Sequence, residues 1–246
     1  MTAPAHILVI IPAFNEAGNL PRTLRTLLAN LPPHTLPMVV DDGSADDTAR
    51  VARDLGVLCL KLPIHLGYGG ALQTGYKYAL QAGFSFLVQM DADGQHDPTM
   101  IPRILDPLLA GEADCVIGNR YHPGSDYQSP LLRRIGRRFF SWMIGWFSGI
   151  PPQDPTSGFR AYNRKALALL TRDHFPLDFP DADVYIMMRY AGVRMREVDV
   201  IMHPPPGTKS MHSGFFHPVR YCAKMLMASF MIFLRHMGGL SFWKAD

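Results

Sequence analysis

Residues 86–93 read FLVQMDAD, an apolar run that ends in two carboxylates one residue apart. Such a run is typical of a strand buried in a sheet that is covered on both faces. Ligands of open α/β sheets bind at the carboxyl ends of the strands, and carboxylate oxygens are the ligands that Mg²⁺ and Mn²⁺ prefer. Asp91 and Asp93 therefore predict a divalent metal site at the edge of a sheet. The alternative interpretation is an ordinary acidic turn after a strand.

Similar apolar runs recur along the chain and alternate with segments of helical periodicity. Strands are predicted near 7–11, 37–41, 57–62, 85–91 and 114–118, and helices near 17–30, 46–55, 69–82 and 98–110. Further elements are predicted as a basic aromatic helix near 130–148, a helix near 181–191, a strand near 193–201 and a last helix near 217–236. The βαβ series predicts an α/β fold with a Rossmann-like, doubly wound, mostly parallel sheet. We expect one domain over 1–215 and a C-terminal amphipathic helix and tail over 216–246.

Composition excludes several classes of protein. The 246 residues are 48% hydrophobic, which is enough for one large buried core, and the net charge of +3 is too small to indicate a nucleic-acid partner. The three cysteines form no CxxC pair, so neither a disulfide framework nor a zinc site is expected. The first apolar run reaches Pro12 after five residues, too few for a signal peptide. We expect a cytoplasmic protein.

Polar residues also follow the first two predicted strands. Asn15 and Glu16 follow the first strand, and Asp41 and Asp42 end the second. Carboxyl ends of parallel strands meet at one edge of a sheet, where helix N-termini offer amides to phosphate, so these residues predict a nucleotide site. Helix capping is the alternative for Asn15 with Glu16, and for Ser44 or Asp46.

The segment Gly67-Tyr68-Gly69-Gly70 precedes a predicted helix and could let a ligand approach the backbone closely. It follows the third strand and lacks the G-x-G-x-x-G spacing, which argues against a nicotinamide or flavin cofactor. The chain also has no G-x-x-x-x-G-K-[ST] phosphate loop, which argues against an ATPase.

Eight motifs together indicate a family. They are VIIPAFNE at 9–16, VVDDGSADDT at 39–48, GYGGAL at 67–72, MDADGQHDP at 90–98, GNRY at 118–121, DPTSGFRAYNRKAL at 154–167, REVDV at 196–200 and GTKSMHS at 207–213. In this order they resemble the family 2 glycosyltransferases of the GT-A fold, and most closely the polyprenyl-phosphate sugar transferases of the dolichyl-phosphate mannose synthase type.

The resemblance implies a metal-dependent, inverting transfer of one sugar from a GDP- or UDP-sugar to a polyprenyl phosphate. It assigns Mg²⁺ or Mn²⁺ to Asp91, Asp93 and Gln95. The residues expected at the donor nucleotide are Pro12, Ala13, Asn15, Glu16, Asp41, Asp42, Gly70, Asp91, Ala92 and Gln95. The residues expected to act in transfer are Asp93, Arg120, Asp181, Asp183 and Lys209. Ser157, Gly158, Phe159 and Arg160 match an SGFR turn on the acceptor side, with core packing as the alternative for Phe159. His65 and His96 are expected to be polar neighbours and not ligands.

Two features bear on the acceptor. A phosphate monoester is mostly dianionic at neutral pH and needs no general base, whereas a soluble or saccharide hydroxyl favours a carboxylate base, for which Asp181 or Asp183 is the candidate. Both are also suited to opening a helix. Pro204, Pro205 and Pro206 stand where the family often has an arginine, which weakens the expected phosphate contact of the loop with Lys209. The alternative to an enzyme is a non-catalytic, membrane-associated protein that binds a nucleotide-sugar.

Two helical segments predict contact with a membrane surface. At 100° per residue the segment 131–148 has a basic face of Arg133, Arg134, Arg137, Arg138, Ser141, Gly145 and Ser148 and an apolar face of Ile135, Phe139, Trp142, Met143, Trp146 and Phe147. The uncharged stretch 225–234 is too short to span a bilayer. We expect peripheral attachment to the cytoplasmic face of a membrane, with packing on the sheet or on a second copy of the chain as the alternative.

Overall fold

The computed structural model describes residues 6–123, 125, 131–177, 180–203 and 216–238. In these residues the strands form one sheet of order β3-β2-β1-β4-β6-β5-β7. The strands are β1 Ile7–Ala13, β2 Thr35–Asp41, β3 Leu58–Lys61, β4 Phe86–Gln89, β5 Cys115–Asn119, β6 Arg160–Asn163 and β7 Met195–Asp199. All neighbouring pairs are parallel except those of β6, which runs antiparallel to β4 and β5. The predicted mostly parallel α/β sheet is confirmed.

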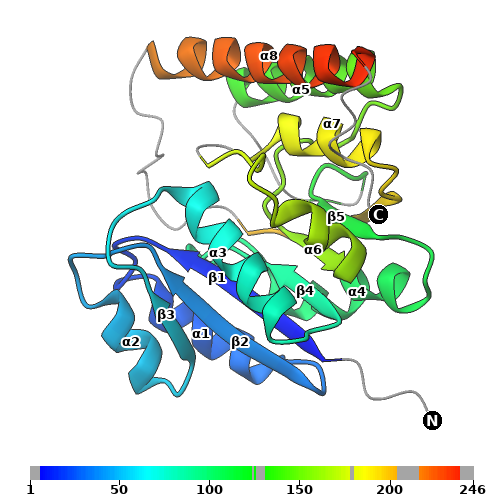
Figure 1. Cartoon of the computed structure of the whole chain (residues 1–246). Helices are drawn as coiled ribbons and strands as arrows, with labels where there is room; N and C mark the ends of the chain where they lie inside the picture. Colours follow the sequence, from blue (N-terminus) through cyan, green and yellow to red (C-terminus); the bar gives the residue numbers. More distant parts are fainter. Residues whose placement is uncertain (1–5, 124, 126–130, 178–179, 204–215, 239–246) are drawn as a thin grey trace.

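Helices cover both faces of this sheet (Figure 1). They are α1 Leu20–Ala29, α2 Thr48–Asp54, α3 Tyr68–Gln81, the 3₁₀ turn η1 Pro98–Met100, α4 Ile101–Leu109, α5 Leu131–Ser148, α6 Arg164–Leu170, α7 Ala182–Tyr190 and α8 Phe216–Met237. Alternate residues of β1 serve two cores: Val9 and Ile11 pack with α1 and α4, whereas Leu8 and Ile10 pack with α3 and α6. Burial on both faces explains why the strand sequence is uniformly apolar.

The sequence prediction omitted β6 and α6. β6 has only four residues, and its first, Arg160, is charged yet buried, so no apolar run marks it. The signal for α6 was Asn163, whose side chain accepts a hydrogen bond from the amide of Ala166 at 3.1 Å and caps the helix. The reversed strand places the segment before Arg160 at the carboxyl end of β4.

Two helices start slightly later than predicted. The first helix begins at Leu20 after Asn19, and the second at Thr48 after Asp47. Asn15 and Ser44 instead connect two loops, because the Asn15 amide donates to Ser44 Oγ at 2.9 Å and the Ala45 amide donates to Asn15 Oδ1 at 3.0 Å. The capping interpretation of these two residues is replaced by cross-linking of the β1 and β2 ends.

Helices α5 and α8 form an outer layer beyond α7, at the end of the molecule farthest from β2 and β3 (Figure 1). α7 packs against both helices, and the rings of Phe147 and Phe233 lie 5.5 Å apart between α5 and α8. The buried side of α5 is formed by Phe140, Met143 and Ile144. The predicted apolar face of α5 is therefore divided, because Trp142 and Trp146 are exposed.

Candidate active site

Asp91 and Asp93 follow the end of β4, as predicted. Asp93 Oδ1 accepts the amide N–H of Gln95 at 3.0 Å, and the Gln95 side chain donates to Asp93 Oδ2. The carbonyl of Ala92, the buried residue between them, accepts from Thr23 Oγ1 of α1 at 2.8 Å. Asp91, Asp93 and Gln95 thus lie together in one tight turn that α1 holds in place.

A chain of hydrogen bonds orients Asp91. Tyr68 Oη donates to Asp91 Oδ1 at 2.8 Å and accepts from Gln89 Nε2 at 3.1 Å, while Tyr76 Oη donates to Gln89 Oε1 at 2.5 Å. Burial raises the pKa of Asp91, although the Tyr68 hydrogen bond and then the positive charge of Arg120 oppose the increase. The hydrogen bond from Tyr68 therefore fixes the orientation of the Asp91 carboxylate, and Tyr68 and Arg120 offset only part of the cost of burying its negative charge.

His96 lies directly behind Asp91. Its Nδ1 accepts the Asp91 amide N–H at 2.9 Å, and its ring stacks on Phe159 with centroids 4.9 Å apart. Burial lowers the pKa of His96 to about 4, so the ring is neutral at physiological pH. Phe159 is fully buried in the core, which agrees with the packing interpretation.

The ends of β1 and β2 meet beside this turn. Ala13 pairs in register with Asp41, and the Ala13 carbonyl accepts the Asp42 amide at 2.9 Å. Glu16, in the loop after β1, has its pKa raised by burial and then by the negative charge of Asp93, against an opposing hydrogen bond from Asn19. The predicted grouping of polar residues from the first, second and fourth strands is therefore present in the structure.

Asp41 and Asp42 have different surroundings. Both oxygens of Asp42 are engaged by the next loop: Oδ1 accepts the Leu66 amide at 2.8 Å and Oδ2 accepts the Gly67 amide at 2.9 Å. Asp41 is fully buried, and its Oδ1 accepts the Ser44 amide at 3.0 Å. Within the described residues Asp41 Oδ2 has no hydrogen-bond partner, but Lys61 Nζ lies 3.9 Å from it and forms an ion pair.

Three glycines permit close approaches around the site. A Cβ on Gly69 would lie 2.4 Å from the Leu177 carbonyl oxygen, and one on Gly70 would lie 2.6 Å from Leu66 Cβ. Gly69 and Gly70 thus lie against other loops of the protein. The expected contact of Gly70 with the nucleotide-sugar stays a prediction. A Cβ on Gly158 would lie 3.0 Å from Asp91 Oδ2, so the SGFR turn rests against the Asp91 carboxylate.

Arg120 is held by Asp154 at the start of the loop that leads to β6. Arg120 Nε and Asp154 Oδ2 are 2.6 Å apart, and Arg120 Nη2 also donates to the Thr156 carbonyl at 3.0 Å. Asp154 is fully buried, and its amide donates to Glu197 Oε1 of β7 at 2.9 Å. The guanidinium therefore positions this loop, and its predicted contact with substrate phosphates stays a prediction.

Asp181 and Asp183 lie at the start of α7, and Asp181 is close enough to Asp91 and Tyr68 to affect them electrostatically. The negative charge of Asp181 acts on Tyr68, Asp91 and Arg160. Asp183 is buried, its Oδ1 accepts the Val184 amide at 2.8 Å, and burial raises its pKa to about 7. Lys209 and the residues 204–206 lie outside the described part of the chain.

The raised pKa of Asp183 predicts a pH-dependent stability. The folded protein keeps a proton on Asp183 that the unfolded chain loses near its ordinary pKa of 3.8, so stability falls as pH rises from about 4 to about 7. Replacing Asp183 with asparagine removes this titration and retains the shape. In calorimetry we expect Asp183→Asn to unfold at a higher temperature than the unmodified chain at about pH 8, and by a smaller margin at about pH 5. Asp106→Asn, an exposed change on α4, is the control. Equal differences at both pH values would contradict the assignment.

Sequence reasoning missed Tyr68, Gln89, Asp154 and Glu197 as residues that support the site. Tyr68 belongs to a quoted motif, but nothing in a single sequence indicates that its hydroxyl reaches Asp91. The pairing of Arg120 with Asp154 joins residues 34 positions apart and depends on the antiparallel β6.

The chain resembles known proteins in sequence and fold. Residues 8–170 match the model described as Glycosyl transferase family 2. The undecaprenyl-phosphate mannosyltransferase of Micrococcus luteus is 34% identical over 209 residues, which are 79% of this chain and 82% of that protein. The polyprenol monophosphomannose synthase of Mycolicibacterium smegmatis is 37% identical over 171 residues, which are 65% of this chain and 62% of that protein. Among solved structures, glucosyl-3-phosphoglycerate synthase from Mycobacterium tuberculosis in complex with phosphoglyceric acid has a TM-score of 0.67 and 19% identity, and covers 99% of this chain and 82% of its own. The predicted GT-A fold is confirmed.

Proposed function

Because this chain belongs to glycosyl transferase family 2, we propose that it transfers one sugar from a nucleotide-sugar to a polyprenyl phosphate, with inversion at the anomeric carbon. The observation that carries the proposal is the meeting of Asp91, Asp93 and Glu16 at the carboxyl edge of the sheet, where β2 also ends in Asp41. The relatives named polyprenol monophosphomannose synthase and undecaprenyl-phosphate mannosyltransferase support the acceptor class.

The residues at the end of β4 fit a Mg²⁺ or Mn²⁺ ion. They offer hard oxygen ligands. Burial raises the pKa of both Asp91 and Glu16, and the negative charges of Asp93 and Asp91 raise the pKa of Glu16 further. Among the described residues no three His, Cys, Asp or Glu side chains are grouped as a complete metal site. Asp91, Asp93 and Gln95 would hold the ion together with donor phosphates. A bound ion supplies charge neutralisation for the departing nucleoside diphosphate.

Removing the Tyr68 hydroxyl should weaken this metal site. The hydroxyl holds Asp91 Oδ1 at 2.8 Å, and loss of a group that orients a metal ligand typically lowers metal affinity by about tenfold or more. Mn²⁺ is titrated into Tyr68→Phe in the presence of nucleoside diphosphate, and binding is monitored by electron paramagnetic resonance. This measurement should show the lower Mn²⁺ affinity. Tyr78→Phe, on the same helix and packed near Phe84, is the matched control. Equal affinity in both variants would remove Tyr68 from this role.

The donor is a GDP- or UDP-sugar bound across the ends of β1 and β2. The carboxylate of Asp41 or of Asp42 accepts an N–H of the base, and Pro12 and Ala13 form the wall beneath it. Asn15, Glu16 and Gly70 complete the nucleoside side, and Asp42 also holds the loop after β3. The structural neighbour from Mycobacterium tuberculosis has been crystallised with Mn²⁺ and UDP, which supports a nucleotide donor for this fold.

The acceptor phosphate attacks the anomeric carbon from the face opposite the leaving group. Its second pKa is near 6, so the dianion is the nucleophile and no general base is required. Arg120 and Lys209 contribute positive charge on this side, and the SGFR turn shapes it. Among the described residues, none of the helices has the length and apolar character that spanning a bilayer requires. On the strength of the acceptor class, we propose that the protein acts from the cytoplasmic face of the membrane that contains its acceptor.

Asp183 favours a second candidate, transfer to a soluble or saccharide hydroxyl. Its pKa of about 7 suits a general base at neutral pH, and Asp181 lies beside it. In this case Asp183→Asn abolishes transfer, whereas transfer to a phosphate dianion continues.

One assay tests the proposal and names the donor. The protein is incubated with Mn²⁺, a short polyprenyl phosphate and a panel of labelled nucleotide sugars, and label entering the organic phase is counted. We expect label from one donor, lost when EDTA is added. Absence of label in the organic phase, with nucleoside diphosphate released when saccharides are added, would overturn the phosphate acceptor and favour the hydroxyl.

A further inference from the structure

The imidazole of His65 lies between an aromatic ring and a carboxylate. Its ring stacks on that of Phe14, with centroids 3.9 Å apart and planes inclined by 26°. Its Nδ1 lies 2.8 Å from Asp42 Oδ2 and 3.2 Å from the Asp42 carbonyl oxygen. Both oxygens are acceptors, so the hydrogen-bonding pattern assigns the proton to Nδ1. A nucleobase with a ring N–H makes the same two kinds of contact, because bases stack on aromatic side chains and donate to carboxylates.

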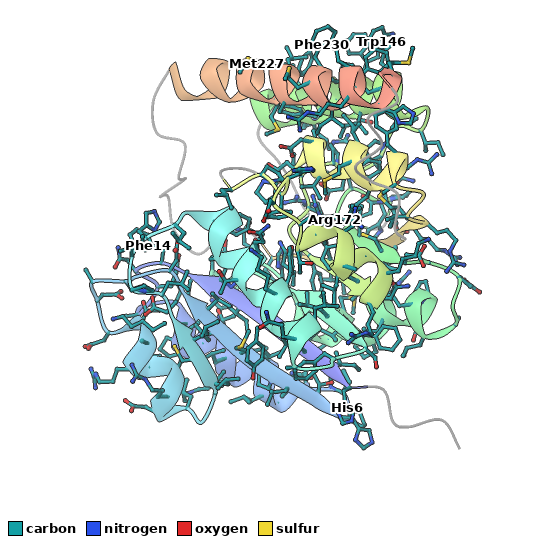
Figure 2. The ribbon with its side chains drawn as sticks, viewed as in Figure 1. His6, Phe14, Trp146, Arg172, Met227 and Phe230 are labelled. Carbon is teal, nitrogen blue, oxygen red and sulfur yellow. The ribbon has the colours of Figure 1, made fainter. Side chains whose placement is uncertain are left out.

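Phe14 and His65 lie at one end of the proposed donor site. Phe14 directly follows β1 at the carboxyl edge of the sheet, opposite the end that carries His6 (Figure 2). Burial raises the pKa of Glu16, two residues after Phe14, and the negative charge of Asp93 raises it further. The loop after β1 therefore extends from the stacked rings to the metal turn after β4. A nucleoside diphosphate bound along this loop would place its base at Phe14 and its phosphates at the metal turn.

The backbone beside His65 is fixed, whereas its side chain has room to turn. The Asp42 carboxylate accepts the amides of Leu66 and Gly67 at 2.8 and 2.9 Å. A Cβ on Gly43 would lie 2.9 Å from the backbone nitrogen of His65, so this loop packs directly on the end of β2. The side chain of His65 is 51% exposed, but that of Asp42 is only 3% exposed. Rotation of the imidazole into solvent would therefore leave the carboxylate in place, with a lone pair available to a ligand.

We infer that the His65 imidazole occupies the position of the nucleotide-sugar's base in the free protein and turns away when the nucleotide binds. The inference rests on the proposed function, because it requires a nucleotide at the ends of β1 and β2. The base then stacks on Phe14 and donates its ring N–H, which uracil and guanine both have, to Asp42 Oδ2. The contacts of His65 with these two residues lower the apparent affinity for the nucleotide, because binding must first break them.

Calorimetric titration of the full chain with UDP and with GDP, in the presence of Mg²⁺, tests the sign of this effect. We expect His65→Ala to bind the preferred nucleotide about threefold to tenfold more tightly, because the competing contacts are gone. Phe14→Ala should bind it about tenfold more weakly, because stacking of the base is lost. His6→Ala, which changes an exposed histidine at the other end of β1, is the matched control and should leave the affinity unchanged. Unchanged or weaker binding by His65→Ala would overturn the inference, because a purely structural histidine gives that result.

Proton NMR of the unmodified chain is a second test that does not depend on how a variant folds. The ring current of Phe14 should shift the ring protons of His65 upfield, and the signal that is missing from the spectrum of His65→Ala identifies them. Saturation with nucleotide and Mg²⁺, which is diamagnetic, should move this signal to the usual position of an exposed histidine. A signal that stays upfield while the nucleotide binds would overturn the inference and leave the proposed function intact. Failure of both the unmodified chain and His65→Ala to bind either nucleotide would overturn the inference together with the proposed donor.

Discussion

Replacing Asp93 with alanine should lower metal-dependent sugar transfer by about a thousandfold. Asp93 is bound twice by Gln95 within the turn that follows β4, and its negative charge acts on Glu16. Its removal therefore takes away both a proposed metal ligand and the partner that holds the Gln95 side chain. Labelled sugar entering a polyprenyl phosphate, measured over a range of Mn²⁺ concentrations, gives the effect directly.

Asp93→Asn separates charge from shape, because the amide retains one oxygen and the size of the side chain. We expect it to be nearly as inactive as Asp93→Ala while the melting temperature stays close to that of the unmodified chain. Asp106→Asn, which removes a charge from an exposed position on α4, should have ordinary activity. Full activity of Asp93→Ala would refute the metal assignment.

Replacing Arg120 with alanine should destabilise the fold by about 3–5 kcal/mol, because a buried ion pair that loses one partner leaves an uncompensated charge. Asp154 is fully buried and the Arg120 side chain is only 12% exposed. Urea unfolding followed by fluorescence measures the loss. Arg194→Ala is the matched control: Arg194 also pairs with a buried carboxylate, that of Asp114, but its side chain is 56% exposed and Lys165 remains on the same carboxylate, so a much smaller loss is expected.

The double variant Arg120→Ala/Asp154→Asn distinguishes two roles of Arg120. Neutralising Asp154 should recover most of the lost stability. If transfer recovers as well, Arg120 acts only by holding the loop before β6. If transfer stays slow while nucleotide binding is close to normal, the guanidinium also acts on substrate phosphates, as the resemblance predicts. A single variant as stable as the unmodified chain would show that the buried pair is not important for folding.

The fold could be predicted because its parallel strands are apolar on both sides and end in polar residues. The same pattern placed Asp41, Asp91 and Asp93 at one edge, since carboxyl ends of parallel strands converge. β6 was not predicted, because a strand of four residues that begins with a buried arginine shows no apolar periodicity. The contacts of Tyr68 with Asp91 and of Arg120 with Asp154 were not predicted, because they join residues that are far apart in the sequence. The helices α1 and α2 start later than predicted. Asn15 and Ser44 are good capping residues in isolation, but here they hydrogen-bond to each other and do not cap a helix.

The reversed direction of β6 limits how the protein can be redesigned. Gln89 of β4 pairs in register with Arg160 of β6, and a Cβ on Gly158, two residues before Arg160, would lie 3.0 Å from Asp91 Oδ2. The loop at 154–159 therefore packs directly against the Asp91 turn. In a chimera, a loop with a larger residue in place of Gly158 should displace the Asp91 side chain, whereas exchanging β4, the loop and β6 together with the glycine retained should preserve the contact. The loop before β6, on the acceptor side, and the Asp91 turn after β4, on the donor side, are connected through the β4–β6 pair. A change to one of them therefore affects the other.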